Sequence, residues 1–161
     1  THSKQEVKKS VVSKAILEMD LLQSLLFCKE EQAQVFAFIQ SYVKEENFLN
    51  PVCRRLYVTY KESIENNQPT DLLSLASSCD SEQVQRLVNH LSKRRLPDEF
   101  IQKHLEETVR KLLEKSWMKS CEELKQKIQS GHNSEDVVLQ LAKEFSELRK
   151  SPPEVGAFVS Q

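Results

Sequence analysis

Glycine is almost absent from this sequence, which has two in 161 residues, at positions 131 and 156. Because the tight turns of β-sheets depend on glycine, this scarcity argues against a β-rich fold. It also excludes a P-loop and a glycine-rich dinucleotide turn, since each needs several glycines where the backbone approaches phosphate. The sequence therefore favours helices and argues against nucleotide chemistry.

Long apolar runs and an excess of one charge are missing as well. No run approaches the roughly 18 apolar residues of a membrane span, and the opening THSKQEVKKS lacks the apolar segment of a signal peptide. Lys and Arg number 23 against 24 Asp and Glu, whereas nucleic-acid-binding domains usually carry a basic excess. We expect a cytoplasmic piece of a longer protein, with no membrane partner and no strong direct nucleic-acid binding.

The usual patterns of metal and catalytic sites do not occur. The cysteines at 28, 53, 79 and 121 form no C-x-x-C, and the four histidines form no H-E-x-x-H. Each cysteine falls where a helix takes a small apolar residue, so we interpret all four as reduced, buried thiols, with a disulfide or zinc role as the alternative. Adjacent carboxylates such as Glu106 and Glu107 diverge on a helix. The sequence predicts no catalytic residue, no metal, no cofactor and no small-molecule ligand.

Apolar residues recur at spacings of three and four almost throughout, and proline marks the joints between segments. The first two predicted helices are Val12–Cys28 and Glu30–Lys44. Three more are predicted to begin after an N-cap residue, at Asn50, Thr70 and Ser81. Asn50 precedes a proline, which suits the first position of a helix.

The stretch from Asp98 to Ser130 has no proline or glycine. As a helix it is about 50 Å long, whereas a bundle formed by the preceding residues is about 30 Å across. The long helix must therefore leave the bundle, and the helical pattern after Gly131 predicts that the chain folds back as a hairpin. The apolar residues that we expect to hold this hairpin together are Trp117, Leu124, Ile128, Val138, Leu141, Phe145 and Leu148. Trp117 has an alternative role in binding a partner.

The predicted fold is all-α, with a bundle of about five helices, a long connecting helix and a C-terminal two-helix hairpin. We place the bundle subdomain at 12–110 and the hairpin subdomain at 111–150. Residues 1–11 and 151–161 are predicted flexible tails, although Val155, Phe158 and Val159 are apolar enough to dock.

One run of residues is familiar. Phe48 is followed by Arg54 and Leu56 at plus six and plus eight, then by an aromatic at Tyr57 or Tyr60, and an earlier helix carries Leu21-Leu22-Gln23-Ser24-Leu25-Leu26. This pattern resembles the C-terminal helicase-binding domain of bacterial DnaG-type primase, over about Val12 to Lys150. The bundle alone is also similar to the N-terminal domain of the replicative helicase.

The resemblance implies a non-catalytic domain of the bacterial primosome. It would bind the N-terminal domain of the hexameric replicative DNA helicase and couple RNA primer synthesis to the replication fork, and the full-length parent would be a DNA-directed RNA polymerase of the primase type. Single-strand-binding protein is a second partner that the resemblance allows. Two alternatives stay open: the N-terminal oligomerisation domain of the replicative helicase, and an unrelated all-α regulatory module.

The hairpin is the expected docking element under this resemblance. If the apolar stripe of its second helix packs inward, other residues face outward and are our candidates for helicase binding: Leu139, Ala142, Ser146, Arg149 and Lys150.

Overall fold

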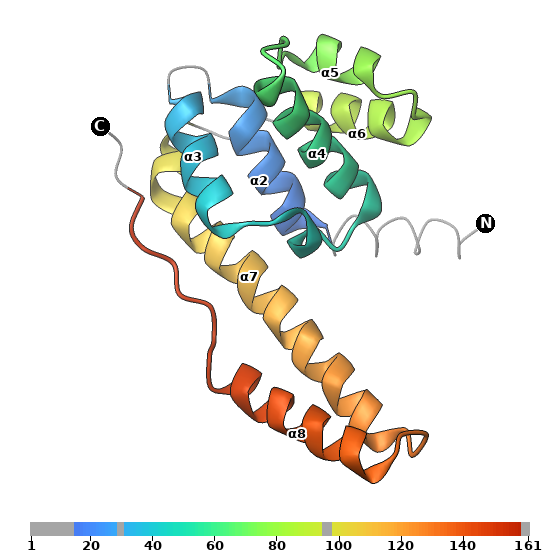
Figure 1. Ribbon diagram of the computed structural model, residues 1–161. Helices are drawn as coiled ribbons and strands as arrows, with labels where there is room; N and C mark the ends of the chain where they lie inside the picture. The colour runs from blue at the N-terminus through green and yellow to red at the C-terminus, as the bar shows by residue number, and fades with distance from the viewer. Residues whose placement is uncertain (1–14, 29–30, 95–97, 159–161) are drawn as a thin grey trace, which may run out of the picture.

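The computed structural model describes residues 15–28, 31–94 and 98–158, and in these ranges the chain is all-α, without a strand. The predicted fold class is confirmed. The elements are α2 (Ile16–Phe27), α3 (Gln32–Tyr42), the 3-10 turn η1 (Glu45–Asn47), α4 (Pro51–Glu65), α5 (Leu72–Ser78), α6 (Glu82–Lys93), α7 (Asp98–Gln129) and α8 (Glu135–Arg149) (Figure 1). None of the helices in these ranges is long and apolar enough to cross a membrane.

Helix α2 lies at the centre of the bundle, between α3, α4 and α7 (Figure 1). Its leucines Leu21, Leu22 and Leu25 are completely or almost completely buried. Helices α5 and α6 cover the other side of α4. The first half of α7 closes the core through the buried side chains Ile101, Leu105, Val109 and Leu112. Burial of these apolar surfaces is the main stabilising contribution to the bundle.

Two of the three predicted N-cap residues are confirmed. The Asn50 side chain accepts hydrogen bonds from the amides of Val52 and Cys53, and the Ser81 hydroxyl accepts one from Val84. The predicted cap at Thr70 is wrong, because Asp71 holds that position. Its carboxylate accepts from both the amide and the hydroxyl of Ser74, which gives Asp71 two bonds at the start of α5.

Beyond Leu112 the long helix leaves the bundle, and α8 runs back along it as the second helix of a hairpin (Figure 1). We call the part of α7 after Leu112, together with α8, the hairpin. Residues 151–158 then return to α3, where Val155 and Phe158 pack against the core. These two residues of the predicted C-terminal tail are therefore docked. Val159 and residues 1–11 lie outside the described ranges, and the subdomain limits 12–110 and 111–150 stay a prediction.

Candidate protein-docking site

The junction between bundle and hairpin lies at two adjacent residues of α7. Asn47, in η1, donates from Nδ2 to the Oγ of Ser116 at 3.1 Å, and its Oδ1 accepts from the Lys44 amide at 2.7 Å. The next residue, Trp117, donates from its indole nitrogen to the carbonyl of Leu148 at 2.7 Å. The helix therefore contacts the bundle through Ser116 and the end of α8 through Trp117.

The turn of the hairpin depends on polar contacts with the end of α7. Gly131 has a φ of 73°, a left-handed conformation that glycine adopts without steric cost. The Lys127 carbonyl, near the end of α7, accepts from the Ser130 hydroxyl at 2.9 Å and from Asn133 Nδ2 at 3.0 Å. These bonds satisfy a carbonyl that has no partner within the helix, and they direct the chain back into α8.

The two sides of α8 differ in exposure. The seven residues that we predicted to hold the hairpin together are all half-buried: Trp117, Leu124, Ile128, Val138, Leu141, Phe145 and Leu148. The five predicted docking residues are all exposed, and we call them the outer face of α8: Leu139, Ala142, Ser146, Arg149 and Lys150. The structure therefore separates the two sets as the apolar stripe predicts.

Leu139 is the most exposed large apolar residue of the hairpin, at 65%. The small side chains Ala142 and Ser146 follow it along the outer face, and Arg149 and Lys150 close the helix with positive charge, which the helix dipole favours at a C-terminus. An isolated exposed leucine is ordinary. A leucine on such a face can enter an apolar pocket on a partner, while the cations about 15 Å further along the helix contact acidic groups of that partner.

Two further exposed apolar residues of the hairpin were not among our candidates. Met118 on α7 is 63% exposed and Val137 on α8 is 45% exposed. Met118 could have been found from the sequence, because it is an apolar residue that falls beside the α7 stripe rather than in it. Val137 precedes Val138 and could not be distinguished from the stripe by spacing alone.

The residues that carried the family resemblance have structural roles in the bundle. Phe48 is fully buried, and its ring lies 4.6 Å from that of Tyr57. Arg54 donates from Nε and Nη2 to the Phe48 carbonyl, at 3.0 and 2.8 Å, and Tyr57 donates from its hydroxyl to the Val43 carbonyl at 3.1 Å. Leu56 is also fully buried. The motif therefore specifies the connection between α3 and α4 rather than a docking surface.

Glu18 is a buried carboxylate that sequence reasoning missed. It is 5% exposed, and its Oε1 accepts a hydrogen bond from the Asn50 amide at 3.0 Å. Burial raises the pKa of Glu18, and the hydrogen bond from Asn50 opposes that rise. Buried carboxylates of raised pKa often mark active sites, but this one binds the backbone at the start of α4, so we assign it a structural role.

The cysteines form no disulfide, and all four lie in described parts of the chain. Cys53 and Cys79 are buried, whereas Cys28 and Cys121 are half-buried, so the prediction of burial is confirmed for two of the four. Burial raises the pKa of the Cys53 thiol to about 12. At neutral pH that thiol is protonated and therefore a poor nucleophile.

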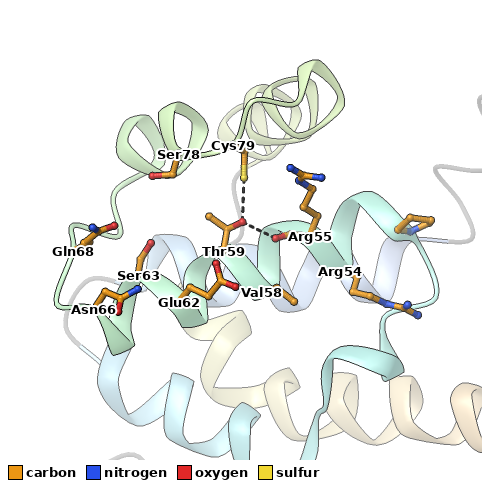
Figure 2. Close-up of a pocket in the computed structure, with 11 residues that line it drawn as sticks. Arg54, Arg55, Val58, Thr59, Glu62, Ser63, Asn66, Gln68, Ser78 and Cys79 are labelled. Carbon is orange, nitrogen blue, oxygen red and sulfur yellow. Dashed lines mark hydrogen bonds between the residues drawn. The ribbon is translucent and has the colours of Figure 1, made fainter.

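A polar groove of about 630 Å³ lies between α4 and α5 (Figure 2). The Cys79 sulfur lies 3.1 Å from the Thr59 hydroxyl oxygen, which in turn is 2.8 Å from the Arg55 carbonyl. Cys79 is among the residues that line the groove, but it is only 3% exposed, so little of its thiol is open to solvent. Among the described residues there is no group of three or more His, Cys, Asp or Glu that could hold a metal ion. We assign no chemistry to this groove.

The fold and the projecting hairpin define an all-α module that offers a surface more readily than a pocket. Residues 12–112 match the family model of the DnaB-like helicase N-terminal domain, and because this is more than half of the sequence, the chain belongs to that family. It is also 27% identical over 150 residues to a DNA primase of Chlamydia pneumoniae, covering 91% of this chain and 24% of that protein. The chain thus spans about a quarter of that relative's length. No solved structure matches.

The two matches differ in what they cover. The family match ends at residue 112, where the last fully buried residue of α7 lies, so it covers the bundle. The similarity to the primase covers 91% of the chain and so must continue into the hairpin. The resemblance inferred from Phe48, Arg54 and Leu56 is confirmed at the level of the family.

Proposed function

We propose that this chain is a non-catalytic interaction domain of a DNA primase. It binds the N-terminal domain of the hexameric replicative helicase through the outer face of α8, and it thereby couples primer synthesis to the replication fork. Membership of the helicase N-terminal domain family and the similarity to a primase support the pairing of these two proteins. The observation that carries the docking site is the 65% exposure of Leu139 on a projecting hairpin.

The size of the outer face suits a modest affinity. One side of a short helix buries at most the roughly 800 Å² per partner of a standard interface. We expect affinities in the micromolar range for one site, raised when several copies occupy one hexamer. Binding of single-strand-binding protein, a cytoplasmic location and the lack of strong nucleic-acid binding belong to the same proposal.

The sharpest test compares two exposed apolar residues on the same helix. Leu139 and Val137 are two positions apart, about 200° around α8, so they face different directions. We expect Leu139→Ala to weaken binding to the helicase N-terminal domain about tenfold, as the loss of a central interface residue does, and Val137→Ala to leave it nearly unchanged. Titration calorimetry measures both variants. Equal effects of the two substitutions would refute the assignment of the outer face.

A deletion gives a coarser test. A chain without residues 132–161 lacks α8 and the segment after it, while α2 to α6 and the buried part of α7 remain. We expect the deleted chain to stay helical by circular dichroism and to lose co-migration with the helicase hexamer in gel filtration. Retained co-migration would mean that the bundle, and not the hairpin, binds the helicase.

The alternative origin is the N-terminal oligomerisation domain of the helicase itself, which the name of the matching family favours. Such a domain self-associates, so sedimentation velocity distinguishes the two. A monomer at tens of micromolar supports the primase origin, and a concentration-dependent dimer or larger ring supports the helicase. The observation that favours a primase origin is that the similarity to a primase continues beyond residue 112.

A further inference from the structure

The segment after α8 returns to the bundle instead of leaving the molecule. Residues 151–158, which we call the strap, have no regular secondary structure and run from the end of α8 to α3 (Figure 1). The strap begins with a hydrogen bond from the Ser151 amide to the Leu148 carbonyl at 3.1 Å. The same carbonyl accepts the indole N–H of Trp117. One end of the strap is therefore joined directly to the contact that closes the hairpin.

The other end of the strap lies on two aromatic residues of α3. The Gly156 amide donates to the hydroxyl oxygen of Tyr42 at 3.1 Å. The ring of Phe158 contacts that of Phe38 edge to face, at 5.2 Å and 61°, and Phe38 contacts Tyr42 in the same manner at 5.3 Å. Val155 is half-buried and packs against the core. The strap thus has a specific binding site on the bundle, formed by Tyr42 and Phe38, which we call its seat.

A side chain at position 156 would fit this seat only if the Tyr42 hydroxyl moved. A Cβ at Gly156 would lie 2.9 Å from the Tyr42 hydroxyl oxygen, closer than such atoms normally approach. The backbone of Gly156 is not left-handed, since Gly131 is the one described glycine with a positive φ. The need for glycine therefore comes from close contact with Tyr42 and not from backbone strain.

These contacts attach the hairpin to the bundle at a second point, so that bundle, hairpin and strap form a closed ring. Helix α7 joins the hairpin to the bundle at one end, and the strap joins α8 to the bundle at the other. Pro152 and Pro153 stiffen the link, because proline fixes its own φ and favours an extended residue before it. We propose that the strap holds the hairpin at a fixed orientation to the bundle, and that its release frees the hairpin and so regulates presentation of the outer face of α8.

The strap is the part of this ring that opens most readily. Its seat consists of one hydrogen bond to an exposed glycine and the packing of half-buried Val155 and Phe158. By contrast, α7 enters the bundle through fully buried side chains. Segments with few buried contacts open locally far more often than the core does. The orientation of the hairpin therefore depends on an equilibrium between a seated and a released strap.

The composition of the chain supplies reporters for this equilibrium. It has two glycines and one tryptophan, so selective ¹⁵N labelling of Gly and Trp in the full chain gives signals from Gly131, Gly156 and Trp117 alone. We expect the Gly156 amide to be protected from hydrogen exchange although its residue is exposed. Gly131, in the hairpin turn, is the internal control. A Gly156 amide that exchanges at the rate of an unstructured peptide would overturn the proposal.

Variants of the seat test whether the strap acts on the hairpin. Tyr42→Phe removes the acceptor of the Gly156 amide, and Phe158→Ala removes the aromatic contact. In both we expect exchange of the Gly156 amide and of the Trp117 indole N–H to accelerate several-fold, with Gly131 unchanged. Ala157→Ser, at an exposed strap position, should alter neither. Release of Gly156 without any change at Trp117 would show that the strap does not control the hairpin.

A double-substitution cycle tests whether Gly156 and Tyr42 act through the same contact. Gly156→Ala should release the strap in the natural background, because the new Cβ meets the Tyr42 hydroxyl. In the Tyr42→Phe background the hydroxyl is absent, so the same substitution should have little additional effect on the Trp117 indole. If Gly156→Ala changed exchange of the Trp117 indole N–H equally in the two backgrounds, the contact between Gly156 and Tyr42 would not be what holds the strap.

The regulatory consequence rests on the proposed function and is measured separately. Tyr42→Phe and Phe158→Ala leave the outer face of α8 intact but release the strap. Because the hairpin then loses its fixed orientation, we expect both substitutions to weaken binding to the helicase N-terminal domain several-fold. Unchanged affinity with a released strap would refute regulation of this site. A natural chain that binds no helicase at all would refute the proposed function, and the exchange measurements would still decide whether the strap holds the hairpin.

Discussion

The bundle and the hairpin of this chain are built in opposite ways. In the bundle, Phe48, Leu56 and Tyr57 are fully buried and their identity is set by packing. In α8 no residue is buried, and the helix packs mainly against α7. The comparison shows why the recognisable sequence pattern lies in the bundle: a residue with many neighbours has few acceptable replacements, whereas an exposed face is limited mainly by what binds it.

The largest expected effect concerns core packing within the bundle, where buried and exposed positions can be compared. Phe48→Ala leaves a cavity beside Tyr57 in the bundle, and we expect the free energy of unfolding to fall by about 3–5 kcal/mol. Leu73, which is 78% exposed, is the control, and Leu73→Ala should cost less than about 0.5 kcal/mol. Urea denaturation followed by circular dichroism measures both. A small effect at Phe48 would mean that the bundle is loosely packed.

Helix caps sharpen the same comparison. Asn50 accepts two amide hydrogen bonds at the start of α4, whereas the Ser134 side chain makes no cap hydrogen bond at the start of α8. Asn50→Ala should therefore cost about 1–2 kcal/mol of unfolding free energy, and Ser134→Ala only a few tenths. Thermal unfolding of the two variants tests this order. The comparison fails if Ser134→Ala proves the more damaging.

Trp117 allows a change confined to the hairpin. Trp117→Phe keeps an aromatic ring and removes the indole N–H that binds the Leu148 carbonyl. We expect the amides of α8 to exchange faster by the equivalent of about 1 kcal/mol, while amides of α2 and α4 stay unchanged. Hydrogen exchange read by mass spectrometry resolves the two regions. Acceleration in α2 as well would show that hairpin and bundle open together.

The smallest expected effect is the pH dependence from Glu18. Burial raises its folded-state pKa above the ordinary value of 4.5, so the folded state holds this proton more tightly than the unfolded chain. Its contribution to stability is present below about that value and is lost as the pH rises through the folded-state pKa. Glu18→Gln retains an acceptor for the Asn50 amide and does not titrate.

The measurement is the difference in unfolding free energy between the natural chain and Glu18→Gln, from urea titrations at several pH values between 4 and 8. We expect the difference to move in favour of the Gln variant as the pH rises. A difference independent of pH, or one that moves toward the natural chain, would show that the hydrogen bond from Asn50 outweighs burial.

Elements with strong local signals were predictable from the sequence. The Asn50-Pro51 pair marked the start of α4, and the absence of proline and glycine after Asp98 gave α7 within one residue of its observed end at Gln129. The exposed positions of the outer face followed from the α8 stripe. The error at Thr70 arose because two neighbouring residues both suit an N-cap, and only the contacts of Asp71 with Ser74 decide between them.

Features that depend on distant contacts were not predictable. Glu18 lies in a helix where a carboxylate suggests solvent exposure, and its partner Asn50 is 32 residues away. The strap depends on Tyr42, which is separated from Gly156 by 114 residues. The pattern of a single segment holds no signal for such pairs. For the same reason, the structural role of Arg54 became visible only with the fold of the α3–α4 connection.

The length of α7 beyond the junction makes the position of the hairpin turn, which we call the tip, sensitive to the direction of the helix at Ser116. From Ser116 to its end at Gln129, the helix extends about 20 Å at 1.5 Å per residue. At that length, a change of about 10° in direction at the junction displaces the tip by about 3.5 Å. This displacement exceeds a full hydrogen-bond length. A surface at the tip can therefore match a partner only if the angle at Ser116 is held within a few degrees.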